Sequence, residues 1–164
     1  MRMRDFVVRE AINPDLKAES KEAVIREMVD NLRAAGYLRG DAAAGTPPVT
    51  ALAASEDVVK AIMKRELLGS TGIGRNVAIP HAKHTTIDRC IGTVAVSRKG
   101  VPFDSLDNEP VFVFVMLISP QERPGDHLRA LENVSRTLRD DSFVKALRQA
   151  PTREAIWELL GDQG

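Results

Sequence analysis

The sequence has one cysteine, few aromatic residues and no net charge. Cys90 cannot form an internal disulfide, and no second ligand lies near it at the spacing of a zinc site. Lys and Arg together number 23, as do Asp and Glu, so no net basic field favours nucleic acid. We therefore expect no nucleic-acid partner and a reducing, cytoplasmic setting. Cys90 itself is expected to be a small buried residue near the start of a strand.

Long apolar runs are also absent. The longest one covers residues 111–118, which is the length of a buried strand and far below the roughly 20 residues that span a bilayer. The three-residue apolar run within the first ten residues is too short for the core of a signal peptide. A chain of 164 residues that is 43% hydrophobic can bury its own core. We expect one domain over residues 1–164, without direct insertion into a membrane.

Apolar residues at spacings of three and four predict helices toward both ends of the chain. The pattern places these helices at residues 15–36, 55–68, 126–140 and 142–149, and after Thr152. Ser55 and Asp126 are the candidate N-caps of two of them. Residues 40–48, rich in Ala, Gly and Pro, are expected to form a surface loop.

The middle of the chain is rich in β-branched residues and predicts three strands, at residues 77–79, 91–97 and 111–118. The last of these has no polar alternation, which is typical of a central strand covered on both faces. Helices, then strands, then helices predict an α/β fold in which a mixed β-sheet is sandwiched between helices.

Residues 66–83, ELLGSTGIGRNVAIPHAK, contain the most informative pattern. Glycines, which permit tight turns and close approach of the backbone to a ligand, precede an apolar strand that ends in Pro80-His81. Pro80 has a fixed φ and biases Ile79 toward an extended conformation, so His81 leaves the strand in a restricted direction. Neutral imidazole is a nucleophile that can accept a phosphoryl group. The alternative is a turn histidine without a chemical role.

This segment resembles the phosphorylation-site signature of the fructose/mannitol-type enzyme IIA (type-2 EIIA) domains of the phosphotransferase system. The signature is an acidic residue, six arbitrary positions, an apolar and a small residue, two arbitrary positions, and apolar-Ala-apolar-Pro-His-small. Its specified positions are occupied by Glu66, Ile73, Gly74, Val77, Ala78, Ile79, Pro80, His81 and Ala82. The resemblance extends over residues 15–160 and implies the fold of mannitol-type IIA and of anion-transporter cytoplasmic domains.

The resemblance implies that His81 is the phosphohistidine, framed by Arg65 and His127. A guanidinium can hold two oxygens of a phosphoryl group at once. His127 is expected in the first turn of a helix, where the backbone already favours an anion by about 0.3–1 kcal/mol. The alternatives are a helix-surface arginine with its charge in water, and a histidine whose ring is hydrogen-bonded by the Asp126 side chain.

Two other patterns around His81 are weaker. His81 and His84 have the spacing of half a metal site, but the sequence offers no third ligand, and the glycines lack the Lys-Ser/Thr of a nucleotide loop. We expect neither a metal nor another cofactor. Lys83, His84 and Arg75 are expected to add positive potential at the rim of the site.

The leading hypothesis is a phosphocarrier, a component of the phosphotransferase system rather than a stand-alone enzyme. The resemblance implies phospho-HPr as the donor, and an enzyme IIB or a regulatory target protein as the recipient. The stretch GSTGIGRNVAIPH is especially similar to the stand-alone nitrogen-regulatory branch, which favours regulation over sugar uptake. The rival hypothesis is a non-catalytic binding module of the same fold. The sequence gives no indication of the oligomeric state.

Overall fold

The structure, a computed structural model, describes residues 2–38, 48–85 and 87–162, without the side chains of 48–53. Nearly all of the predicted loop at 40–48 lies outside the described residues. The helices are α1 (Met3–Phe6), the 3₁₀ turn η1 (Arg9–Ala11), α2 (Lys21–Ala34), α3 (Pro48–Leu68), α4 (Pro124–Thr137), α5 (Asp141–Gln149) and α6 (Arg153–Asp162). The strands are β1 (Asn13–Leu16), β2 (Gly72–Gly74), β3 (Val77–Ala78), β4 (His81–His84), β5 (Ile91–Val101) and β6 (Val111–Pro120).

The described strands form one mixed sheet in the order β1-β5-β6-β3-β2, and β4 also pairs with β6. The central pair, β5 and β6, is antiparallel, whereas β3 and β4 run parallel to β6 along its other edge. β1 extends the sheet parallel to β5, and β2 folds back antiparallel on β3. The predicted α/β fold with a mixed sheet between helices is confirmed.

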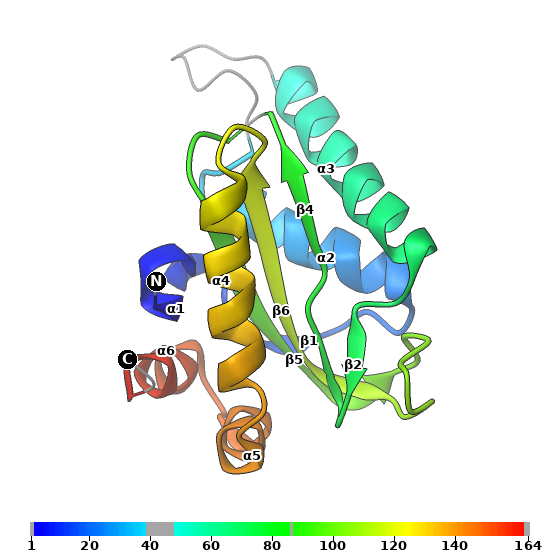
Figure 1. The fold of residues 1–164 in the computed structure, drawn as a ribbon, viewed down its shortest axis with the longest axis vertical. Coiled ribbons are helices and arrows are strands. Elements are labelled where there is room, and N and C mark those ends of the chain that lie inside the picture. Colours follow the sequence, from blue (N-terminus) through cyan, green and yellow to red (C-terminus); the bar gives the residue numbers. More distant parts are fainter. Residues whose placement is uncertain (1, 39–47, 86, 163–164) are drawn as a thin grey trace.

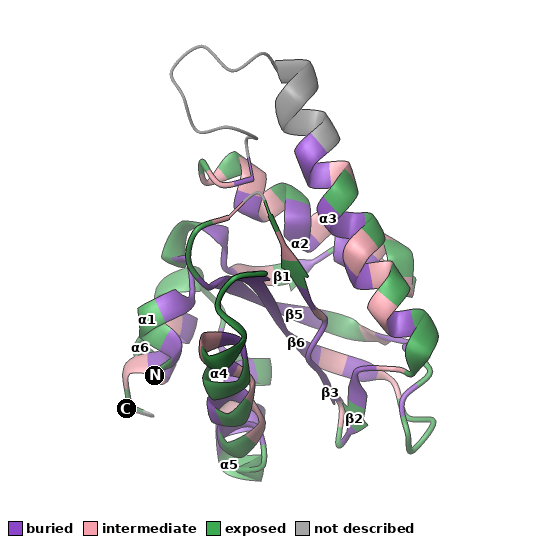
Figure 2. Cartoon of the chain, turned by 45° about the horizontal axis from the view of Figure 1, so that its top comes forward, coloured by how far each residue is buried: buried purple, intermediate pink, exposed green. Residues whose placement is uncertain are grey.

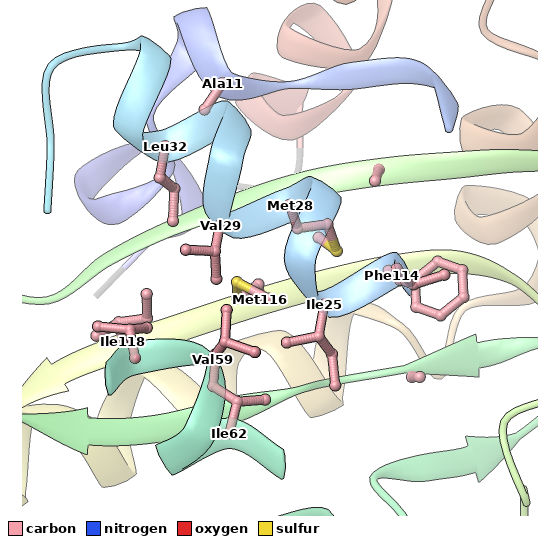
Figure 3. Packing of buried hydrophobic residues seen from close by; sticks show 14 of the residues in the cluster. Ala11, Ile25, Met28, Val29, Leu32, Val59, Ile62, Phe114, Met116 and Ile118 are labelled. Atoms are coloured by element: carbon pink, nitrogen blue, oxygen red, sulfur yellow. The ribbon is translucent and has the colours of Figure 1, made fainter. Parts of the chain in front are cut away.

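Helices cover both faces of this sheet. The side chains of β6 alternate between the two faces, and the apolar residues on each face pack against a different set of helices. Phe114, Met116 and Ile118 pack with α2 and α3 (Figure 3), whereas the odd-numbered residues 113–117 pack with α1, α4, α5 and α6. Figure 1 shows α4 crossing one face while α2 lies behind the sheet. The strands at the centre are buried, and α3 and α4 turn exposed residues outward (Figure 2). No helix of the described residues is long and apolar enough to cross a bilayer.

The predicted helix at 15–36 is too long at its start, because Asn13–Leu16 forms β1 and pairs with β5. The helix begins at Lys21, and the side chain of the N-cap Ser20 accepts a hydrogen bond from the backbone N–H of Ala23 at 3.3 Å. The three predicted strands are confirmed. The missed strands β1, β2 and β4 have only three or four residues each, so they depend on pairing with distant segments rather than on local pattern.

Both predicted N-caps are wrong. Ser55 lies inside α3, and its hydroxyl donates to the carbonyl oxygen of Leu38 at 3.4 Å instead of closing a helix end. α4 begins two residues earlier than predicted because Pro124 takes its first position, with Arg123 as the N-cap. Asp126 therefore lies within the first turn, where its carboxylate pairs with Arg129.

Candidate functional site

His81 is the first residue of β4, which pairs with the central strand β6. In Figure 1 this strand lies between α3 and α4. The proline before it interrupts the ladder: the N–H of Ile79 donates to Thr71 at 3.1 Å, and the carbonyl of Pro80 accepts from Leu117 at 3.0 Å. Nδ1 of His81 lies 2.7 Å from the carbonyl oxygen of Ile79. Since a carbonyl oxygen only accepts, Nδ1 carries the proton and Nε2 keeps its lone pair.

His127 lies in the first turn of α4 and is buried. Its ring centroid is 5.5 Å from that of His81, with the ring planes inclined by 50°. Nδ1 of His127 lies 2.6 Å from Oγ of Ser119, the penultimate residue of β6. The alternative in which Asp126 satisfies this ring is therefore wrong, because the hydrogen bond comes from the sheet and not from the helix start.

Arg65 lies in the last turn of α3, a helix that packs beside β4. Its guanidinium donates to the carbonyl oxygen of Gly69 at 2.8 Å, which holds the side chain at the end of the helix. The positive charge is close enough to His81 to lower the pKa of that imidazole. The structure thus brings Arg65, His81 and His127 together from α3, β4 and α4.

Burial keeps both imidazoles neutral. Desolvation lowers the pKa of His81, and the charge of Arg65 lowers it further, against opposing effects of the Ile79 carbonyl and Glu66. Desolvation also lowers the pKa of His127, to about 4, with smaller contributions from His81 and Lys83. Near neutral pH each ring therefore carries a single N–H.

A buried charged network supports His81 from behind, and sequence reasoning missed most of it. The carboxylate of Glu66 accepts from Nζ of Lys21 at 3.0 Å, and it also accepts from the backbone N–H and the hydroxyl of Thr71. Thr71 in turn accepts from Ile79, whose carbonyl holds the ring of His81. The acidic position of the sequence pattern was the one signal for this network; the contribution of Lys21 comes from 45 positions earlier in the chain.

The glycines of the pattern serve the β2–β3 hairpin. A Cβ on Gly72 would lie 2.4 Å from Oγ of Ser105, so the close approach is to a neighbouring loop, and Gly74 adopts a left-handed φ of 91°. Arg75 follows in the turn and donates to the carbonyl oxygens of Leu138 and Arg139, just beyond the C-terminal end of α4. The prediction that Arg75 lies at the rim is wrong, because His127 is at the opposite end of that helix.

Lys83 lies on β4 and acts electrostatically on His127, as expected of a rim residue. Among the residues that the structure describes, no group of three or more His, Cys, Asp or Glu side chains is placed to hold a metal ion. The chemistry that the site offers is therefore a bare imidazole nitrogen, a neighbouring N–H donor and a guanidinium.

Comparison with known proteins gives the family. Residues 5–163 match the family model for "Phosphoenolpyruvate-dependent sugar phosphotransferase system, EIIA 2". The chain belongs to this EIIA family. It is 32% identical over 160 residues to a nitrogen regulatory protein of Bradyrhizobium diazoefficiens, covering 98% of this chain and 95% of the relative. As an EIIA protein, it is a phosphocarrier or a regulator of the phosphotransferase system.

Solved structures agree with this assignment. The crystal structure of nitrogen regulatory protein IIA-Ntr from Neisseria meningitidis superposes with a TM-score of 0.78 at 26% identity, covering 95% of this EIIA chain and 97% of the other. The enzyme IIA of mannitol from Escherichia coli, solved in complex with phosphorylated enzyme IIB, gives a TM-score of 0.71 at 20% identity over 93% and 95% of the chains. The second likeness supports the fold alone.

Proposed function

We propose that this EIIA protein accepts a phosphoryl group on Nε2 of His81. The observation that supports this most directly is the 2.7 Å hydrogen bond from Nδ1 to the carbonyl oxygen of Ile79. It holds the ring proton on Nδ1 and leaves the Nε2 lone pair for phosphorus. The lowered pKa of His81 keeps that lone pair available at neutral pH.

The transfer is a displacement between two histidines. The bond from phosphorus to the donor nitrogen breaks as the bond to Nε2 of His81 forms, and the released pair of electrons stays on the donor imidazole. The Nδ1 proton remains on His81, hydrogen-bonded to Ile79, so no proton has to leave the site in this step. Positioning and electrostatic stabilisation then account for the catalysis.

Arg65 and His127 stabilise the phosphoryl group in this proposal. The guanidinium of Arg65 offsets the charge on the oxygens and can contact two of them at once. The ring of His127, whose centroid is 5.5 Å from that of His81, offers an N–H at the distance where a phosphoryl group on His81 would extend. Both groups act without changing their own protonation.

For the partners, we infer that phospho-HPr is the donor and that the recipient is an enzyme IIB or a regulatory target protein. The mannitol enzyme IIA with the same fold was solved with phosphorylated enzyme IIB. A nitrogen regulatory protein matches nearly the full length of this chain, which favours the regulatory branch over sugar uptake. A cytoplasmic location, where these partners would be found, is part of the same proposal.

Phosphate transfer tests the proposal. The protein is incubated with enzyme I, HPr and labelled phosphoenolpyruvate, and protein-bound label is measured. We expect acid-labile, base-stable label on the wild type and none on His81→Ala, because the variant lacks the Nε2 that the Ile79 contact leaves bare. His127→Ala is the informative companion: it should still take up label, but more slowly, because it loses a donor and keeps the acceptor.

Two results would contradict the proposal. Wild-type protein that stays unlabelled with a cognate HPr would favour the non-catalytic binding module. Label that persists on His81→Ala and disappears from His127→Ala would move the acceptor to His127. The free energy of unfolding of each variant, measured in urea, shows that the loss of label is not a loss of fold.

A further inference from the structure

Ser119 is the hydrogen-bond partner of His127 and has no direct role in the proposed transfer step. It extends β6 by one residue beyond the apolar run, and its side chain is fully buried. Residues 113, 115 and 117 of this strand pack toward α4, so the alternation places Ser119 on the same face. Its Oγ lies 2.6 Å from Nδ1 of His127.

A second buried group continues this contact. The thiol of Cys90, just before β5, donates to Oγ of Ser119 at 3.4 Å, and Cys90 is 8% exposed, as the sequence predicted. The three side chains therefore form a neutral line, Cys90–Ser119–His127, that ends at the phosphoryl site. None of the three carries a charge in the arrangement, in contrast to the Lys21–Glu66 pair behind His81.

The donor and acceptor roles in this line of hydrogen bonds determine whether Nε2 of His127 carries a proton or a lone pair. A hydroxyl has one proton, and imidazole nitrogen is a far better acceptor for it than a thiol sulfur. Ser119 therefore accepts from Cys90 and donates to Nδ1 of His127, which places the single ring proton of His127 on Nε2. The opposite direction would leave a bare Nε2 lone pair facing the oxygens of a phosphoryl group.

We propose that Ser119, with Cys90 behind it, is a positioning residue that holds His127 as the Nε2–H tautomer. Together with the Ile79 carbonyl, it gives the two neighbouring imidazoles opposite tautomers. His81 then has the bare Nε2 of an acceptor, and His127 has the Nε2–H of a donor that cannot compete for the phosphoryl group. This inference rests on the proposed function of His81 and adds the device that distinguishes the two rings.

The tautomers can be read without any phosphate transfer, from the imidazole ¹⁵N resonances of the unphosphorylated protein at pH 7. We expect His81 to be protonated on Nδ1 and His127 on Nε2. Ser119→Ala should shift His127 toward a mixture of tautomers and leave His81 unchanged. A wild-type His127 protonated on Nδ1 would overturn the inference, even where His81 is labelled normally.

A double-mutant cycle gives the kinetic test. Ser119→Ala should slow phosphoryl transfer about tenfold, less than the roughly 10²–10³-fold cost of removing a positioned donor outright. In a His127→Ala background the same substitution should have no further effect, because its target is gone. Equal slowing in both backgrounds would overturn the positioning role and indicate a general packing defect.

Thr93→Val is the matched control. Thr93 is fully buried on β5, opposite Met116 of β6, and its hydroxyl has no hydrogen-bond partner among the described residues. Its replacement removes a buried hydroxyl from the same sheet without touching His127. We expect wild-type tautomers and a wild-type transfer rate; a tenfold loss here would attribute the Ser119→Ala result to the sheet rather than to the hydroxyl.

Discussion

The two sides of the candidate site differ in the groups that support their histidines. On the α3 side, His81 is backed by charges, with Arg65 at the helix end and Glu66 paired with Lys21 beneath it. On the α4 side, His127 is backed by neutral groups, Ser119 and Cys90. Charges control how strongly an anion is held, whereas a neutral line controls which nitrogen carries the proton. The two sides should therefore fail in different ways.

Of the substitutions considered, replacement of Lys21 should have the largest effect, and this effect should be on the stability of the fold. Lys21→Met removes Nζ. The variant therefore loses the cation–π contact with the Phe103 ring and leaves the carboxylate of Glu66, whose side chain is 2% exposed, without its cation. Breaking a buried pair from one side costs about 3 kcal/mol in the free energy of unfolding, measured in urea at pH 7.

Lys17→Met is the control for that loss, because Lys17 is 77% exposed in its pair with Asp15. Such a surface pair contributes roughly 0.5 kcal/mol or less. The double variant Lys21→Met/Glu66→Gln should recover much of the stability, since no uncompensated charge remains. Similar losses for Lys21→Met and Lys17→Met would show that the charged side of the site is not held by this pair.

A fall in pH should destabilise the fold through His127, on the α4 side of the site. The folded state holds the pKa of His127 at about 4, below the ordinary value of 6.5, so this ring stabilises the fold fully above pH 6.5 and loses that contribution as the pH falls toward 4. His81 and Lys83 on β4 face the ring and oppose its protonation. We expect the loss from pH 7 to pH 4 to be about 2 kcal/mol.

His127→Gln isolates that contribution, because glutamine can still hydrogen-bond to Ser119 but does not titrate. Unfolding in urea at several pH values should show the wild type losing about 2 kcal/mol more than the variant between pH 7 and pH 4. The titration of the carboxylates, none of which is among the groups that shift the pKa of His127, is common to both proteins and cancels. Parallel pH profiles would mean that His127 is not held neutral by the fold.

Arg65→Ala should have the smallest effect of these substitutions when each is expressed as a free energy. The effect should be on the rate of phosphoryl transfer and not on the free energy of unfolding. Loss of the guanidinium should slow transfer from phospho-HPr about tenfold or more, equivalent to about 1.4 kcal/mol of transition-state stabilisation. Lys64→Ala, at the neighbouring exposed position, removes the same charge from the same helix turn and should leave the rate unchanged. If both substitutions slowed the transfer equally, Arg65 would act only through the overall positive charge of α3 and not through a direct contact with the phosphoryl group.

Much of this architecture could be predicted from local pattern. The run at 111–118 was recognisable as a central strand because every position in it is apolar, and the pattern from Glu66 to Ala82 indicated the family. The short strand β1 was not predictable, because Asn13–Leu16 carries little strand signal and is extended by its pairing with β5. The cap of α4 was missed because Pro124 and Asp126 compete as start signals, and the proline took the first position.

The orientation of His81 is determined by the adjacent residues in the chain, whereas the hydrogen-bond partners that surround the two imidazoles are brought together by tertiary packing. Pro80 and the extended Ile79 are adjacent to His81 in the chain, so backbone stereochemistry alone restricts where that ring can point. The contacts of Lys21 with Glu66, 45 positions apart, and of Ser119 with both Cys90 and His127 arise only when α2, α3, α4 and the sheet pack together. A side-chain hydrogen bond requires two atoms to lie within about 3 Å, and only tertiary packing places distant residues that closely. Local sequence thus restricts the orientation of His81, and the packed fold supplies the groups that distinguish this histidine from His127.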